Sequence, residues 1–359
     1  MGSPALADRE NYVTRAQRSF PPSILSDLST SSASNLLSLL KHLKQGPVTL
    51  ALGAGVSASA GLPDWAQLLR NICAMFFVHW DFDIESKRLS ISEPPRELSV
   101  AFVDEFFWED GQAMDRACSL CQGDALLAAQ LVKNCIRAVD WRYLLRHALY
   151  GDYPYDVNRS HLVDSLVRLC SSSGGTIGAV LNYNYDDLFR LALDRQSIPS
   201  VSLWYGKATS ARDNRLRIYH PHGISSLHGS DISRTTLAED DYQEELRSPF
   251  SWANLVQTGL FTGSTCIFVG ASMTDPNLRR LLAASVVSSR SPHYAFLPRS
   301  GSDRDATMFD ALFDQDLLRI GVRPIRFDKR PATGNEFSRL HELLDMCSDH
   351  LANGGLVWS

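Results

Sequence analysis

Short apolar runs alternate with segments of helical period along most of this chain. The run Val48-Thr49-Leu50-Ala51-Leu52 is continuously apolar apart from one threonine, as in a strand buried on both faces. A glycine-rich turn follows, and apolar residues then recur at helical spacing from Trp65 to Phe77. We expect a strand, a turn and a helix in that order, which is the repeating unit of parallel α/β sheets.

Five further strands are predicted downstream of this unit, with segments of helical period between them. The strands cover residues 176–181, 217–220, 265–269, 294–297 and 324–327. The helical segments include residues 162–170, 188–193, 278–284 and 336–344. The alternation predicts an α/β fold with a Rossmann-like, doubly wound parallel sheet.

Two regions fall outside this alternation. Residues 1–34 are mostly small and polar, and we expect a flexible N-terminal arm, with Asn35 capping a first helix over Leu36–Leu43. Residues 80–150 show helical spacing and no convincing strand. The helical spacing is found in 98–107 and 125–139. We therefore predict one domain over residues 35–359 that contains a large helical insertion.

Charge, hydropathy and cysteine content narrow the classes of partner. The 35 Lys and Arg against 40 Asp and Glu give a net charge of −5, so nucleic acid is not expected as a direct ligand. No run approaches the roughly 20 apolar residues of a membrane helix, and the N-terminus lacks a secretory signal pattern. The seven cysteines are odd in number and scattered. We expect a cytoplasmic protein with reduced thiols and no membrane partner.

The turn after the first strand is the first candidate binding element. Gly53, Ala54, Gly55 and Ser57 belong to a G-x-G-x-x-A pattern between a predicted strand and a helix. Small residues there let the backbone approach a pyrophosphate. A tight strand-to-helix turn without any ligand would show the same pattern, so the turn alone does not establish a nucleotide site.

The residues around and beyond this turn resemble the Sir2-like (sirtuin) family. The stretch from Gly53 to Trp65, with its Gly-Leu-Pro-Asp extension, is similar to the sirtuin signature. Three more segments follow in the family's order, and the resemblance spans roughly residues 48–344. They are Asn184-Tyr185-Asp186, His222-Gly223 and Asp275-Pro276-Asn277. The resemblance implies that NAD⁺ is the substrate.

The resemblance also assigns roles to individual residues. Asn184 would align the ribose and a water below it, because an amide both donates and accepts hydrogen bonds. Asp186 would accept from the loop or a ribose, although it could equally cap the next helix, as Asp275 and Asn277 could cap theirs. The full set of expected cofactor-binding residues is Gly53, Ala54, Gly55, Ser57, Pro63, Asp64, Trp65, Asn182, Asp186, Gly270, Ser272, Asp275 and Asn277.

A histidine supplies the expected general base. His222 follows an apolar strand that would carry it to the carboxyl edge of the sheet, and an imidazole titrates near neutral pH. His228 begins a second His-Gly pair only six residues later and is the competing candidate. His220 would lie deeper in the sheet, and we interpret it as structural.

Differences from the protein-deacylating sirtuins change the group that is expected to attack the ribose of NAD⁺ from an acyl-lysine to water. Those enzymes carry two C-x-x-C pairs after the His-Gly, which form a zinc ribbon, and this chain has none there. Its single such pair, Cys118 and Cys121, lies in the predicted insertion and cannot complete a tetrahedral site, so no zinc is expected. The pattern resembles instead the Sir2-like NAD⁺ hydrolases of bacterial antiphage defence. That resemblance implies a regulated homo-oligomer, with a HerA-type ATPase or a phage-derived trigger as partner.

Three other functions compete with NAD⁺ hydrolysis. A protein-lysine deacylase would use the same chemistry on NAD⁺, and the missing ribbon counts against it. A non-catalytic NAD-binding subunit of a defence complex would bind NAD⁺ without releasing nicotinamide. A dehydrogenase would need its own substrate acid and base, and would lack the Gly-Leu-Pro-Asp and Asn-Tyr-Asp segments.

Overall fold

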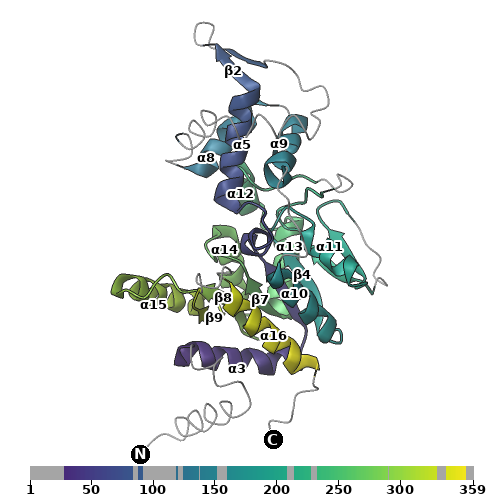
Figure 1. The fold of residues 1–359 in the computed structure, drawn as a ribbon, viewed down its shortest axis with the longest axis vertical. Coiled ribbons are helices and arrows are strands. Elements are labelled where there is room, and N and C mark those ends of the chain that lie inside the picture. The colour runs from purple at the N-terminus through teal and green to yellow at the C-terminus, as the bar shows by residue number, and fades with distance from the viewer. Residues whose placement is uncertain are drawn as a thin grey trace, which may run out of the picture.

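A seven-stranded parallel sheet forms the centre of the protein (Figure 1). The computed structural model describes residues 28–83, 88–91, 119, 124–136, 138–151, 160–207, 214–227, 233–289, 291–329 and 337–352. The strand order is β5-β6-β4-β1-β7-β8-β9. The strands are β1 (Val48–Leu52), β4 (Ile177–Asn182), β5 (Ser200–Leu203), β6 (Leu216–Tyr219), β7 (Thr265–Val269), β8 (His293–Pro298) and β9 (Val322–Phe327). The predicted doubly wound α/β fold is confirmed.

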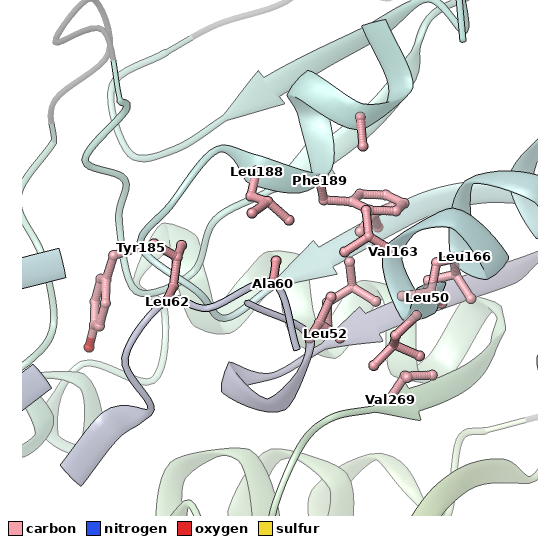
Figure 2. Packing of buried hydrophobic residues seen from close by; sticks show 14 of the residues in the cluster. Leu50, Leu52, Ala60, Leu62, Val163, Leu166, Tyr185, Leu188, Phe189 and Val269 are labelled. Atoms are coloured by element: carbon pink, nitrogen blue, oxygen red, sulfur yellow. The ribbon is translucent and has the colours of Figure 1, made fainter. Parts of the chain in front are cut away.

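Side chains of successive strand residues point to opposite faces and enter two separate cores. Leu50 and Leu52 of β1 pack in the first core with Val163 and Leu166, as Figure 2 shows, whereas Ala51 belongs to the second. Helices α3 (Thr30–Gln45), α10 (His161–Ser172), α11 (Leu188–Arg195) and α16 (Ser338–Ala352) contribute to the first core. Helices α13 (Trp252–Gly263), α14 (Pro276–Ser285) and α15 (Arg304–Arg319) contribute to the second. Both faces are therefore covered, which explains the continuous apolar strands.

The first helix begins earlier than the sequence pattern predicts. Helix α3 starts at Thr30, and the Ser29 side chain caps it by accepting from the Ser32 N–H group. Asn35 lies inside the helix, where its Nδ2 donates to the carbonyl oxygen of Pro324 at 2.7 Å. The predicted start at residue 36 is wrong because the small polar residues before it form a turn of helix that packs beside β9.

The predicted insertion is helical but also contains two strands, contrary to expectation. Helices α5 (Trp65–His79), α8 (Ala125–Cys135) and α9 (Ala138–Tyr150) lie at one end of the molecule (Figure 1). Strands β2 (Trp80–Asp83) and β3 (Arg88–Ile91) form an antiparallel pair directly after α5. Four-residue strands give too short an alternation to be distinguished from a helix end. The predicted segment 98–107 lies outside the described residues.

Strand β5 was not predicted either, because two serines interrupt its apolar residues at the edge of the sheet. Helices α4 (Ala54–Ala58) and α12 (Glu239–Arg247) complete the described elements. Helix α12 joins the insertion to the sheet domain, since Lys133 of α8 contacts both carboxylate oxygens of Asp241 at 2.6 Å. Among the described helices, none has the length and apolar character required to cross a membrane.

Candidate active site

A cavity of about 620 Å³ opens at the carboxyl ends of β1, β4 and β7 and of the neighbouring strand β6. Strand β1 lies between β4 and β7 in the sheet. The chain builds the sheet from β1 toward β4 on one side and later crosses to β7 on the other, so this edge is the topological switch point, where α/β sheets bind ligands. The volume is in the range of small-molecule sites. The predicted residues that line it are Gly53, Ala54, Gly55, Ser57, Pro63, Asp64, Trp65, Asn184, Asp186, His222, Gly270, Ser272, Asp275 and Asn277.

Close backbone packing explains the glycines of the cavity wall. The N–H groups of Gly53 and Gly55 donate to Val269 and Gly270 carbonyl oxygens, both at 2.9 Å. A Cβ atom on Gly53 would lie 2.6 Å from Cα of Ala271. Gly270 has a φ of +67°, and its Cβ would lie 2.6 Å from the Val56 nitrogen. These glycines are therefore required to join the loops after β1 and β7, whether or not a ligand is bound.

Asn184 connects the glycine turn to the loop after β4. Its Nδ2 donates to the Gly53 carbonyl oxygen at 3.0 Å, and its own backbone N–H donates to Oδ1 of Asn182 at 3.1 Å. Asn182 is not among the residues that line the cavity, although the sequence assigned it to cofactor binding. The structure places Asn182 behind the loop, where it holds the backbone of Asn184 in place.

Asp186 combines the two roles that its position allowed. One carboxylate oxygen accepts from the Ser57 hydroxyl at 2.6 Å, and the other accepts from the Leu188 N–H at 3.0 Å, at the start of α11. Burial raises the pKa of Asp186 from 3.8 to about 6, although these two hydrogen bonds oppose the shift. The site thus contains a carboxyl group that titrates close to neutral pH.

His222 lies in the turn after β6, and its ring faces the cavity between two tyrosines. The Tyr183 and Tyr242 rings meet it edge to face, with centroids at 5.2 and 5.8 Å. Burial lowers the pKa of His222, against the opposing charges of Asp275 and Glu245. Burial therefore favours the neutral imidazole, which is the form able to accept a proton.

The other two histidines of this region differ from His222. His220 is buried outside the cavity lining, with Nε2 at 3.3 Å from Oγ of Ser202, and burial lowers its pKa to about 4. This placement fits the structural role expected for it. His228 lies outside the described residues. Gly223 has a φ of +87° and its Cβ would lie 2.1 Å from the Arg234 carbonyl oxygen, so the His-Gly pair needs glycine for backbone reasons.

The residues of the Pro-Asp-Trp segment lie at the mouth of the cavity. Asp64 accepts from the Gln67 N–H at 2.8 Å and so caps α5, which begins at Trp65. The Trp65 side chain is 38% exposed at the rim. This segment therefore positions the insertion relative to the glycine turn as well as lining the site.

The loop after β7 supplies the opposite wall. Oδ1 of Asp275 accepts from the N–H groups of Asn277 and Leu278 and caps α14, while Oδ2 points toward His222. The Asn277 side chain is occupied within the protein, donating to Asn254 at 3.0 Å and accepting from Arg280 at 2.7 Å. Ser272 is exposed, and its hydroxyl pairs with that of Thr274 at 2.6 Å.

Several cavity residues were not identified from the sequence. Tyr183 lies inside the Asn-Tyr-Asn segment, so its position directly after a predicted strand could have indicated it. Tyr242 and Leu246 come from α12, a helix rich in charged residues that was not predicted, and Leu126 comes from α8. Only the tertiary structure brings these side chains to the site.

Within the described ranges, no group of three or more His, Cys, Asp or Glu side chains is placed to hold a metal ion. The pair Cys118 and Cys121 lies outside those ranges.

Comparison with known proteins identifies one domain. Residues 178–317 match the family model of the SIR2-like domain. The match includes Asn184, His222 and Asp275 and begins after the glycine turn. No curated protein matches the chain. A SIR2-like domain on a parallel α/β sheet is consistent with an enzyme that uses NAD.

Proposed function

We propose that this protein hydrolyses NAD⁺ at the nicotinamide–ribose bond and releases nicotinamide and ADP-ribose. The observation that carries the proposal is the meeting of Asn184 and His222 in one cavity. They follow the neighbouring strands β4 and β6, lie within the SIR2-like match and face the glycine turn of β1.

The residues present fit the demands of this reaction. A cationic nicotinamide is already a good leaving group, so the protein must position the ribose, stabilise an oxocarbenium-like transition state and deliver water. The neutral imidazole of His222 would take the proton of that water, and the Asn184 amide would align it with the ribose. Apolar residues of α8 and α12 around the cavity would limit access of other water.

In this proposal the phosphates of NAD⁺ would bind in the cavity without a salt bridge. Among the described residues that line it there is no lysine or arginine. The N–H groups of Gly53 and Gly55 already donate within the protein, so the pyrophosphate would be held mainly by the hydroxyls of Ser272 and Thr274, and the small residues of the glycine turn would let it approach closely. This arrangement relies on hydrogen bonds from neutral groups, and the bound dinucleotide would be recognised mainly by shape and hydrogen bonding.

Water is the proposed acceptor because the sequence between His222 and Thr265 contains no cysteine, so the ribbon of the deacylases is missing. Hydrolysis would deplete NAD⁺, which suits an effector of antiphage defence in the cytoplasm. Such an activity has to be controlled. We therefore propose that the protein forms a homo-oligomer, whose activity is regulated by a partner such as a HerA-type ATPase or by a phage-derived trigger.

The test is incubation of the purified protein with NAD⁺ and quantification of nicotinamide and ADP-ribose by chromatography. His222→Ala and Asn184→Ala are expected to lower turnover strongly, and His161→Ala, which changes an exposed histidine of α10, is the matched control. Full turnover in both site variants would overturn the assignment. Nicotinamide release that depends on an acetyl-lysine peptide would identify a deacylase, and NAD⁺ binding without release would identify a non-catalytic subunit.

A further inference from the structure

Helix α9 of the insertion ends against the two loops that carry Asn184 and His222. Tyr150 is the last residue of this helix, and its side chain is buried. The Tyr150 hydroxyl donates to the carbonyl oxygen of Ser225 at 2.8 Å, and Ser225 lies three residues after His222. The same hydroxyl accepts from the backbone N–H group of Asp187 at 3.4 Å, three residues after Asn184. One side chain of the insertion therefore contacts both loops.

The two loops are also bonded to each other beside Tyr150. The Ser225 N–H group donates to the Tyr185 carbonyl oxygen at 2.7 Å. The Leu227 N–H group donates to Oδ1 of Asp187 at 3.0 Å, and this oxygen lies 3.2 Å from the Tyr150 hydroxyl. Residues 220–226 are all buried, so water does not readily replace a hydrogen bond that is lost here. A displacement of one loop is therefore expected to displace the other.

Other residues of the last turns of α9 fix the helix in this position. Nη2 of Arg146 donates to the Leu227 carbonyl oxygen at 2.6 Å, which is a second bond between α9 and the loop after β6. The Ala148 carbonyl oxygen accepts from Nδ2 of Asn71, on α5, at 3.1 Å. Tyr150 is not among the residues that line the cavity. It would therefore act on a bound substrate only through the loops that it contacts.

We propose that Tyr150 is a positioning residue, which fixes the loop after β6 against the loop after β4 and so aligns His222 with Asn184. A general base acts only within hydrogen-bond reach of the proton that it removes, and a misplacement of about 1 Å can cost about a hundredfold in rate. The consequence for turnover rests on the NAD⁺ hydrolysis proposed above. Movement of α9 would shift His222 relative to Asn184, so the insertion would influence the reaction through this one hydroxyl.

The variant Tyr150→Phe removes the hydroxyl and keeps the ring. In steady-state kinetics kcat for NAD⁺ should fall by about 10- to 100-fold, while KM should change by less than about threefold because the cavity lining is intact. Tyr294→Phe is the matched control, since Tyr294 is also buried, donates to Oγ of Ser38 at 2.8 Å and lies outside the cavity lining. Both variants should lower Tm to a similar extent, and only Tyr150→Phe should lower kcat.

Hydrogen exchange measured by mass spectrometry tests the same contact without any turnover. Peptides that cover residues 183–188 and 222–227 should exchange faster in Tyr150→Phe than in the wild type, by up to about tenfold, the equivalent of one lost hydrogen bond. The same peptides should exchange at the wild-type rate in Tyr294→Phe.

Unchanged exchange in Tyr150→Phe would overturn the proposal, and so would an unchanged kcat in an active protein or an equal loss of kcat in Tyr294→Phe. A lower kcat without faster exchange would assign Tyr150 a direct role at the substrate, which is likewise a different conclusion. If the wild type releases no nicotinamide, the proposed hydrolysis fails, and the exchange rates alone decide whether Tyr150 holds the two loops together.

Discussion

Nε2 of His222 lies 3.5 Å from Oδ2 of Asp275, and this contact joins the loop after β6 to the loop after β7. The other oxygen of Asp275 caps α14, so the carboxylate is fixed on the helix that it starts. Tyr183 and Tyr242 hold the imidazole from two sides. The structure thus provides an oriented histidine whose neighbouring carboxylate favours the protonated ring, while burial favours the neutral one.

Removing the charge of Asp275 should change the pH dependence of the site. Burial already lowers the pKa of His222, and the carboxylate opposes that shift, so Asp275→Asn should lower the pKa of His222 further. Asparagine still caps a helix, which keeps α14 in place. The pKa is measured by NMR titration of labelled histidine, which does not require enzymatic activity. An unchanged or higher His222 pKa in the variant would show that the two groups do not interact.

Substitution of His222 itself should reduce turnover without unfolding the protein. If the ring is the general base, His222→Ala should lower kcat by about 10²- to 10⁴-fold, the usual contribution of such a group. Binding of NAD⁺, measured by calorimetry, should change much less, because in the proposed binding mode the phosphates and adenosine would contact other walls of the cavity. Loss of binding together with loss of turnover would assign His222 to binding instead.

Asp186 should make stability fall as the pH rises toward neutrality. Its pKa is raised from 3.8 to about 6, so the folded protein holds this proton more tightly than the unfolded chain does. The stabilisation is complete below about pH 4 and is lost as the pH passes 6, with a total change of about 3 kcal/mol. Asp186→Asn mimics the protonated form. The free energy of unfolding, measured in urea, should therefore be higher in the variant than in the wild type by an amount that grows from pH 4 to pH 8. A difference that stays constant over this range would contradict the raised pKa of Asp186.

Apolar periodicity was sufficient to predict the parallel sheet, because strands such as β1 and β7 are buried on both faces and read as continuous runs. It was not sufficient for β5 or the β2–β3 pair, which are short. The motifs predicted Asn184 and His222 as site residues, and both line one cavity, while their catalytic roles stay predictions. They could not reveal Tyr242, because only the tertiary structure brings α12 beside the loop after β6, where Tyr242 contacts His222.

Glycine at position 270 should be necessary for stability. Gly270→Ala introduces a Cβ at a φ of +67° and 2.6 Å from the Val56 nitrogen, so both backbone strain and a steric clash are expected. We expect a loss of about 3 kcal/mol or more in the free energy of unfolding. Gly174→Ala is the matched control, because Gly174 has a φ of +56° with no atom within 4 Å of the added Cβ. Equal losses in the two variants would show that the loop after β7 adjusts freely.

The ion pair between Lys133 and Asp241 should couple the helical insertion to the active site. Asp241 is buried, accepts from Lys133 at 2.6 Å and also binds the N–H groups of Leu237 and Ala238, so it anchors α12 beneath α8. Lys133→Met removes the main cation and leaves a buried carboxylate, with Arg234 at 3.6 Å as a weaker partner. We expect the free energy of unfolding to fall by about 2–3 kcal/mol. This is less than the full cost of an unpaired buried charge, because Arg234 compensates in part.

A double-mutant cycle with Asp241→Asn isolates this interaction. If the pair is the anchor, Lys133→Met in the Asp241→Asn background should cost less than about 1 kcal/mol, since no charge remains to be compensated. Because Tyr242 follows Asp241 on α12 and contacts His222, the single variant should also raise KM for NAD⁺ more than it lowers kcat. Additive losses in the cycle, with KM unchanged, would show that α8 and α12 are held together by their apolar contacts alone.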